Sequence, residues 1–162
     1  MNKLEIERKF LICMPNENEL RAMDGIRVLN ISQAYTTKGA RIRRIEENGN
    51  ITYIKTVKKH ISDLVRLETE EEISIDEYDN LLGFKEGNTI EKTRYVYPYK
   101  GKNIEIDIFP FWQKQAFLEV ELSSEDEDCP LPIFIDVIKE VTEDKAYRNY
   151  ALSKNIPIEE NF

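Results

Sequence analysis

Carboxylate residues recur at every second position in three short segments of the chain, each interleaved with apolar residues. The three pairs are Glu5 and Glu7, Glu105 and Asp107, and Glu119 and Glu121. Alternate residues of a β-strand point to the same face of a sheet, so each pair would present two carboxylates side by side. Hard oxygen ligands of this kind suit Mg²⁺ or Mn²⁺. The spacing therefore predicts carboxylates that could hold divalent metal ions.

Basic residues show the same alternation in other segments. Those that share a strand face are Arg41 and Arg43, Lys92 and Arg94, and the single lysines Lys9 and Lys55. A further segment places both kinds of charge on one face, with Arg66, Glu68, Glu70 and Glu72. Lysine and arginine bind phosphate oxygens, and arginine can bond two of them at once. Carboxylates, a divalent metal and a polyphosphate together describe phosphoryl-transfer chemistry.

The chain offers few residues for other kinds of catalysis. It has one histidine, His60, and two cysteines, Cys13 and Cys129, in no metal-like spacing. This scarcity argues against a Cys/His zinc site and against Ser/His or Cys/His nucleophilic catalysis. We expect the two cysteines to be free thiols. The G-x-x-x-x-G-K-[ST] pattern is absent, which excludes a P-loop enzyme.

The net charge of the 162-residue chain is −8, with 31 acidic residues against 23 lysines and arginines. A protein that binds DNA through its surface needs a basic face, so we expect no DNA partner. A polyanion must instead meet a local group of bases inside an acidic molecule. No apolar run approaches the roughly 20 residues of a membrane span, and the first ten residues do not resemble a signal peptide. The sequence therefore predicts a cytoplasmic protein without a membrane partner.

Alternating apolar and polar residues predict eight strands. These cover residues 4–12, 31–37, 40–46, 51–59, 64–74, 90–99, 103–110 and 116–123. Helical signals are fewer. One short helix should end near Met23, and a second should begin at the Ser74–Glu77 capping box and end near Gly83. Two later helices are expected over 132–139 and 144–155. Short connections without a linker indicate one α+β domain spanning residues 1–162.

The charged strand faces permit two arrangements. An antiparallel sheet commonly has one packed face and one wet face, so the charges could simply be solvated. However, acid pairs and base pairs segregate onto different strands, which a solvated face does not require. Eight strands can also close into a barrel whose interior holds one ligand, and the buried charges then need cations and an anion to neutralise them. We expect an eight-stranded antiparallel β-barrel, or tunnel, with a few peripheral helices.

Taken together, these segments resemble the CYTH superfamily, the triphosphate tunnel metalloenzymes. The run Glu5-Ile-Glu7-Arg-Lys9 is similar to the ExExK signature of that family. The resemblance continues in family order through Gln33-Ala-Tyr35, Arg41-Ile-Arg43, Lys55, Arg66-x-Glu68-x-Glu70, Lys92-x-Arg94, Glu105-x-Asp107, Glu119-x-Glu121 and residues 144–149. It covers residues 4 to about 152, nearly the whole chain.

The resemblance implies divalent-metal hydrolysis of a terminal phosphate and gives roles to individual residues. The metal-binding carboxylates would be Glu5, Glu7, Asp107, Glu119 and Glu121. The triphosphate-binding bases would be Lys9, Arg41, Arg43, Lys55, Lys92 and Arg94, with Lys145 closing one mouth. The catalytic set would be Glu5, Glu7, Lys9, Glu119 and Glu121. Glu68 and Glu70 would line the bore beside the bases, whereas Arg8 and Arg44 should point outward.

The resemblance also implies the cofactors and the class of substrate. Two ions, Mg²⁺ or Mn²⁺, would neutralise phosphate oxygens and activate a water for in-line attack. Inorganic tripolyphosphate, the smallest substrate, suits a single-domain chain that has no evident base-recognition element. Nucleoside triphosphates would be side substrates. The family also contains thiamine triphosphatases, RNA triphosphatases and adenylate cyclases, which stay open as alternatives.

Two other classes of protein fit the same sequence. A binding module would hold a metal–polyphosphate complex without cleaving it, and a structural β-domain would bind no ligand. The oligomeric state stays open between a monomer and a homodimer. The apolar run from Phe109 to Trp112 has two interpretations, namely an exposed subunit interface or a plug that packs a helix against the barrel wall.

Overall fold

Long alternating segments of the sequence become antiparallel strands in the computed structural model, which describes residues 2–160. The strands are β1 (Asn2–Cys13), β2 (Arg27–Thr36), β3 (Arg41–Glu47), β4 (Asn50–His60), β5 (Val65–Ile73), β6 (Lys85–Tyr99), β7 (Lys102–Ile108), β8 (Gln115–Glu121) and β9 (Val137–Glu140). The helical elements are α1 (Glu17–Arg21), α2 (Ile75–Leu82), the 3₁₀ turn η1 (Lys145–Tyr147) and α3 (Asn149–Leu152).

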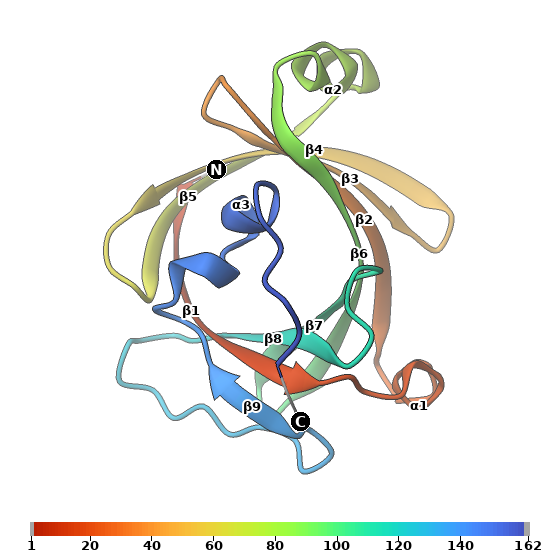
Figure 1. Cartoon of the computed structure of the whole chain (residues 1–162), viewed down its shortest axis with the longest axis vertical. Helices are drawn as coiled ribbons and strands as arrows, with labels where there is room; N and C mark the ends of the chain where they lie inside the picture. Colours follow the sequence, from red (N-terminus) through yellow and green to blue (C-terminus); the bar gives the residue numbers. More distant parts are fainter. Residues whose placement is uncertain (1, 161–162) are drawn as a thin grey trace.

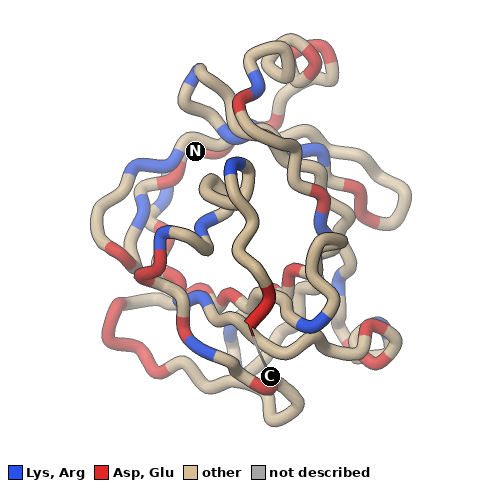
Figure 2. Tube along the Cα trace, viewed as in Figure 1, with Lys and Arg blue, Asp and Glu red and all other residues tan. Residues whose placement is uncertain are grey.

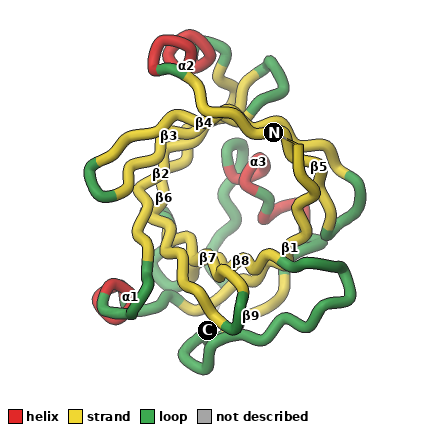
Figure 3. The backbone as a smooth tube through the Cα atoms, turned by 180° about the vertical axis from the view of Figure 1, so that it is seen from behind, coloured by secondary structure: helices red, strands yellow, loops and turns green. Residues whose placement is uncertain are grey.

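The sheet closes on itself. Its strand order is β5-β4-β3-β2-β6-β7-β8-β1-β9, and an additional antiparallel pairing joins β1 to β5 over Asn2–Ile6. Figures 1 and 3 show the resulting ring of strands from its two ends. The prediction of an eight-stranded antiparallel barrel is confirmed, with β9 as one extra strand. Closure removes the sheet edges that an open arrangement would leave unpaired.

The main apolar cluster lies outside the ring, against one wall. Four outward residues of β7 and β8 are at most 1% exposed, namely Ile104, Ile106, Leu118 and Val120. They pack beneath Leu20 of α1 and the chain that follows β8. Because successive strand residues face opposite sides, packing these apolar residues outside turns their charged neighbours inward. The barrel interior is therefore polar along this wall.

A second apolar cluster fills one end of the bore. Inward-facing Leu11 and Phe117 meet Phe109, Trp112 and residues of η1 and α3 there. The indole ring of Trp112 lies edge-on to the rings of Phe109 and Phe117, with centroids 5.6 Å and 5.1 Å apart. Phe109 is 1% and Trp112 is 3% exposed. Of the two interpretations of this apolar run, the plug is confirmed.

Local signals predicted the early helices better than the late ones. Asn16 and Ser74 cap α1 and α2 by accepting hydrogen bonds from Glu19 N and Glu77 N, at 3.2 Å and 3.1 Å. The helix expected over 132–139 is wrong, because β9 occupies 137–140 and pairs with the part of β1 that β5 leaves free. None of the helices within residues 2–160 is long and apolar enough to cross a membrane.

The helix expected over 144–155 is also wrong in extent. Arg148 adopts an extended conformation, with φ −71° and ψ 144°, and so separates η1 from α3. In Figure 1 these two short elements and the chain after them lie across the ring of strands. The hydroxyl of Tyr147 donates to Glu160 Oε1, and Trp112 Nε1 donates to the Pro157 carbonyl. The C-terminal segment is thus tied to the plugged end of the barrel.

Candidate active site

Charged residues occur all around the ring of strands (Figure 2). Most of the acidic side chains that line its interior come from one arc of neighbouring strands and most of the basic ones from another, with Lys9 and Arg66 among the exceptions. The acidic arc runs over β7, β8, β1 and β5 and carries Glu105, Asp107, Glu119, Glu121, Glu5, Glu7, Glu68 and Glu70. The basic arc runs over β4, β3, β2 and β6 and carries Lys58, Arg41, Arg43, Lys92 and Arg94. Acid pairs and base pairs lie on different strands in the sequence. The sheet order places the strands with acids next to one another, and likewise the strands with bases, so that each kind forms a continuous wall.

Like charges sit directly opposite one another within the acidic arc. Glu7 pairs in register with Glu121, and Glu105 pairs with Glu119. Such cross-strand pairs of like charge destabilise a sheet. Burial, and then the charge of Glu119, holds the pKa of Glu7 well above its usual range. A divalent cation at this wall would relieve the repulsion.

Two lysines, Lys58 of the basic arc and Lys9 of β1 itself, partly neutralise other carboxylates of this wall. Lys58 Nζ lies 3.1 Å from Glu5 Oε1 and 3.6 Å from Glu68 Oε2, and Lys9 Nζ lies 3.5 Å from Glu119 Oε1. Burial acts to raise the pKa of Glu119, but the charge of Lys9 and then that of Arg94 outweigh it and lower this pKa to about 2. Glu119 is therefore an ionised carboxylate at neutral pH.

The guanidinium groups of β3 have donors to spare. Arg43 Nη2 donates to Glu70 Oε2 at 3.2 Å, while the Nε atoms of Arg41 and Arg43 are buried and make no hydrogen bond within the part of the chain that is described. Burial, and then the charge of Arg41, lowers the pKa of Arg43 to about 9. Buried donors are normally paired, so these N–H groups are suited to an anion that enters the bore.

Both arcs open onto one cavity of about 230 Å³, which we call the central cavity. Its charged lining consists of Lys3, Glu5, Glu7, Arg41, Arg43, Lys58, Glu68, Glu70, Arg94, Glu105, Glu119 and Glu121. Of the carboxylates expected to bind metal, Glu5, Glu7, Glu119 and Glu121 meet here, as do the expected bases Arg41, Arg43 and Arg94. Lys9 lies next to Glu119 and lines an adjoining hollow.

Asp107 has a different place from the one expected. Its carboxylate is 1% exposed and accepts hydrogen bonds from Lys92 Nζ at 2.8 Å and from Arg94 Nε and Nη2 at 2.7 Å and 2.9 Å. With both oxygens bonded to bases, Asp107 anchors Arg94 rather than standing free for a metal. Lys92 is likewise 4% exposed and does not line the central cavity.

Lys55 is the clearest correction to the expected phosphate-binding set. Its Nζ lies 3.8 Å from Glu71 on the outer side of the barrel, and its neighbour three residues on, Lys58, faces the cavity instead. The register explains this, because Lys58 is opposite Glu68 whereas Lys55 is opposite Glu71. Strand β4 carries a lysine on each face, so its alternation alone did not distinguish them.

Lys145 also lies away from the site. It is exposed on η1, whereas Arg148 and Asn149, just beyond it, line the hollow beside Lys9. Lys145 lines neither of the two cavities, and its closing of a mouth stays a prediction. Sequence reasoning missed Lys58, Arg148 and Asn149 because the break at Arg148 and the register of β4 both depend on tertiary structure.

The carboxylates of the central cavity suit a divalent cation that keeps some of its water ligands better than one bound by protein ligands alone. Among residues 2–160, no three Asp, Glu, His or Cys side chains converge closely enough to form a ready-made metal cage. Magnesium commonly keeps several waters and binds through one or two carboxylates together with phosphates of the substrate. The paired Glu7 and Glu121, facing a wall of bases, suit that mode of binding.

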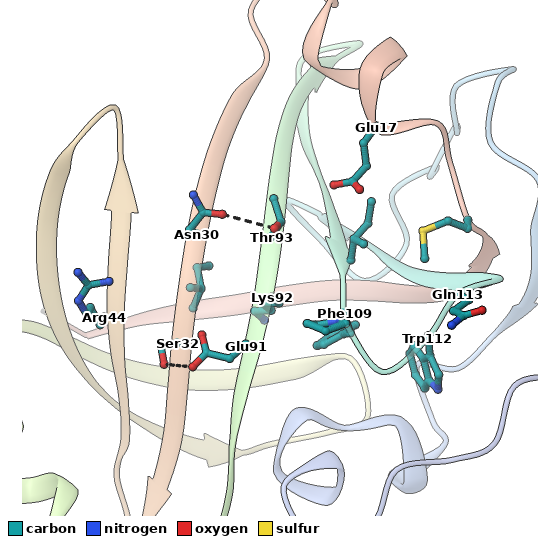
Figure 4. A pocket seen from close by; sticks show the side chains of 14 residues that line it. Glu17, Asn30, Ser32, Arg44, Glu91, Lys92, Thr93, Phe109, Trp112 and Gln113 are labelled. Atoms are coloured by element: carbon teal, nitrogen blue, oxygen red, sulfur yellow. Dashed lines mark hydrogen bonds between the residues drawn. The ribbon is translucent and has the colours of Figure 1, made fainter.

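A larger hollow, about 630 Å³, lies on the outer surface and is not the site (Figure 4). Two pairs of its polar side chains form hydrogen bonds within the hollow. Ser32 Oγ donates to Glu91 Oε1 at 2.7 Å, and Thr93 Oγ1 donates to Asn30 Oδ1 at 3.4 Å. Arg44 lines this outer hollow, as its strand parity predicted. Arg8 also points outward, with Nη2 lying 2.6 Å from Glu140.

Similarity to known proteins agrees with this geometry. A protein from Nitrosomonas europaea described as "Inorganic triphosphatase" is 37% identical over 160 residues, which cover 94% of this chain and 99% of that protein. The crystal structure of the inorganic triphosphatase NE1496 matches with a TM-score of 0.59 and 30% identity over 94% of this chain and 99% of that one. PH1819 from Pyrococcus horikoshii OT3 matches with a TM-score of 0.51 and 30% identity, over 75% and 80% of the two chains.

Fold and site together define a closed antiparallel barrel with a charged bore. The family model of the CYTH domain matches residues 3–150. The chain therefore belongs to the CYTH family, as the charged motifs of its strands indicated.

Proposed function

We propose that this protein is a divalent-cation-dependent triphosphatase that hydrolyses the terminal phosphate of inorganic tripolyphosphate. The observation that carries the proposal is the pair of facing arcs, one acidic and one basic, around a single enclosed cavity. A relative named as an inorganic triphosphatase, 37% identical over nearly the whole chain, supports the choice of substrate.

The carboxylates Glu5, Glu7, Glu119 and Glu121 are the residues that would hold the cations, two ions of Mg²⁺ or Mn²⁺. When bound, such ions supply charge neutralisation on phosphate oxygens and an activated water. Lys58 ion-pairs with Glu5, and Lys9 with Glu119. These two lysines keep the carboxylates ionised and in place.

The bases bind and orient the phosphate chain. Arg41 and Arg43 present buried Nε–H groups to its oxygens, and Arg94 is fixed for the same purpose by its two bonds to Asp107. Hydrolysis forms one bond from a water oxygen to the terminal phosphorus and breaks one anhydride P–O bond. Its products are orthophosphate and pyrophosphate, and the proton of the water passes to bulk solvent. Preorganised donors in a site shielded from water stabilise the charge that develops on these oxygens.

A substrate panel tests the proposal. Purified protein is incubated with tripolyphosphate, ATP or thiamine triphosphate, with Mg²⁺ or Mn²⁺ and without metal, and both phosphate release and cyclic AMP are measured. We expect metal-dependent phosphate release that is fastest from tripolyphosphate, and no cyclic AMP. Tight tripolyphosphate binding without released phosphate would instead identify a binding module. Formation of cyclic AMP as the main product would identify a cyclase.

A further inference from the structure

A second hollow, of about 200 Å³, adjoins the central cavity, and we call it the side cavity. The two share Glu7, Arg41, Lys58, Glu119 and Asn149 as lining residues. The remaining lining of the side cavity comes from the barrel strands, from the turn between β4 and β5, and from the chain after β9. These residues are Lys9, Tyr35, Asp63, Arg66, Val141, Thr142, Arg148 and Tyr150. A group leaving the central cavity on this side would therefore meet different side chains.

The two cavities differ in the sign of their charge. The central cavity is lined by seven acidic residues and five bases. The side cavity is lined by three acidic residues and five bases, the bases being Lys9, Arg41, Lys58, Arg66 and Arg148. An anion can be neutralised here by protein bases alone, whereas the central cavity needs cations.

Arg148 supplies donors that the fold does not use. Its Nε and Nη2 atoms are buried and form no hydrogen bond among residues 2–160, and Nη2 lies 3.5 Å from Asp63 Oδ1 in an ion pair. Lys9 Nζ donates to the Tyr147 carbonyl at 2.7 Å, which fixes the chain just before Arg148. A guanidinium held in this way is preorganised for an oxyanion with two acceptor oxygens.

We propose that the side cavity is an orthophosphate site, which binds the phosphate released from the central cavity without needing a metal ion. The link to release rests on the proposed triphosphatase function. Metal-free binding of orthophosphate does not rest on that function, because it depends only on the five bases, Arg148 among them. The site would make orthophosphate a product inhibitor that acts through the side cavity.

Isothermal titration of orthophosphate into protein stripped of metal on a chelating resin tests the site directly. We expect one site in the wild-type protein and a dissociation constant at least about tenfold weaker in Arg148→Gln, because a bond between charged groups is lost. Arg148→Lys keeps the charge and should fall between the two. Arg44→Gln removes the same charge from the outer surface and should bind as the wild type does. Circular dichroism melts confirm that each variant is folded.

The outcomes separate this site from the enzymatic proposal. Metal-free binding that depends on Arg148, in a protein that hydrolyses no triphosphate, would support the site and refute the triphosphatase. Metal-dependent hydrolysis together with equal orthophosphate affinity in wild type and Arg148→Gln would refute the site alone. Absence of any metal-free binding by the wild-type protein would likewise overturn it. In an active enzyme, orthophosphate should inhibit Arg148→Gln about tenfold more weakly than the wild type.

Discussion

At the scale of single residues, Glu7 is the carboxylate whose surroundings most oppose its ionisation. It faces Glu121 across the strand pair, and burial together with Glu119 raises its pKa well above the usual value of 4.5. The folded protein therefore holds a proton on Glu7 at pH values where the unfolded chain has lost it. Wild-type stability must fall as the pH rises through that window, because the folded state binds more protons there.

Replacing this residue, as Glu7→Gln, should remove the conflict and the activity together. Without metal, we expect the melting temperature of the variant to match the wild type near pH 4.5 and to exceed it by a few degrees at pH 8, since about 1 kcal/mol shifts the melting temperature of a domain this size by about 2–4 °C. Melts across pH 4.5–8 in metal-free buffer measure this. A variant less stable than the wild type at pH 8, or one that retains full activity, would contradict the assignment of Glu7.

The lysines of β4 provide a matched pair of variants. Lys58 faces the central cavity and pairs with Glu5, whereas Lys55 pairs with Glu71 outside. Lys58→Gln should lower kcat/KM for tripolyphosphate by about 100-fold, as expected when one preorganised donor is lost. Lys55→Gln should stay within about twofold of the wild type. Equal losses in both variants, or a larger loss at Lys55, would show that the register of β4 is different.

Much of this site was predictable because its residues alternate with apolar ones on strands with one packed face. Glu5, Glu7, Arg41 and Arg43 reach the bore as their parity requires. Lys58 did not stand out, because β4 carries a lysine and apolar residues on both faces, and only its pairing with β5 decides which face is inside. The sequence also could not predict the hydrogen-bond partners of Asp107, because these bonds link β7 to Lys92 and Arg94 on the neighbouring strand β6.

At the scale of elements, the C-terminal segment depends on a close approach to β6. Gly87, at φ +70°, lies against the carbonyl of Ser153, and an added Cβ would come within 2.7 Å of that oxygen. The same carbonyl accepts a hydrogen bond from Asn88 N at 2.7 Å. A side chain at position 87 must therefore displace the end of α3.

The substitutions Gly87→Ala and Gly101→Ala separate backbone strain from this contact. Both glycines have positive φ, but nothing lies within 4 Å of a Cβ at Gly101. Each variant should lose about 1–2 kcal/mol through the left-handed conformation, and Gly87→Ala should lose about 1–3 kcal/mol more through overpacking. Denaturant melts measure the difference. Equal stabilities of the two variants would mean that the segment does not pack on β6 as described.

The elements that sequence reasoning missed are the ones that fill positions created by the barrel. Strand β5 pairs with only the first part of β1, and β9 forms beside the part of β1 that β5 does not reach. No local pattern in residues 132–139 therefore predicts β9. The capped helix α2, by contrast, follows from the Ser74 side chain and its acceptance of the Glu77 N–H. Local chemistry predicts local elements, and closure of the sheet determines the others.

At the scale of the whole molecule, a chain of net charge −8 encloses bases that keep buried donors, at Arg41 and Arg43, suited to an anion. Cations and anion should therefore stabilise the barrel jointly. In a variant that cannot turn over, such as Glu5→Gln, tripolyphosphate with Mn²⁺ should raise the melting temperature by more than the sum of the separate shifts. A ligand that binds only the folded state stabilises it by an amount that grows with the logarithm of the ligand concentration divided by the dissociation constant. Additive shifts in a thermal-shift assay would argue against a shared site.

The most direct measurement is anomalous X-ray scattering from crystals grown with Mn²⁺ and a triphosphate analogue that resists hydrolysis. The account predicts manganese peaks inside the ring of strands, within coordination distance of carboxylates among Glu5, Glu7, Glu119 and Glu121. It also predicts phosphate density against Arg41, Arg43 and Lys58. Manganese bound only on the outer surface, with the bore filled by water, would contradict the account.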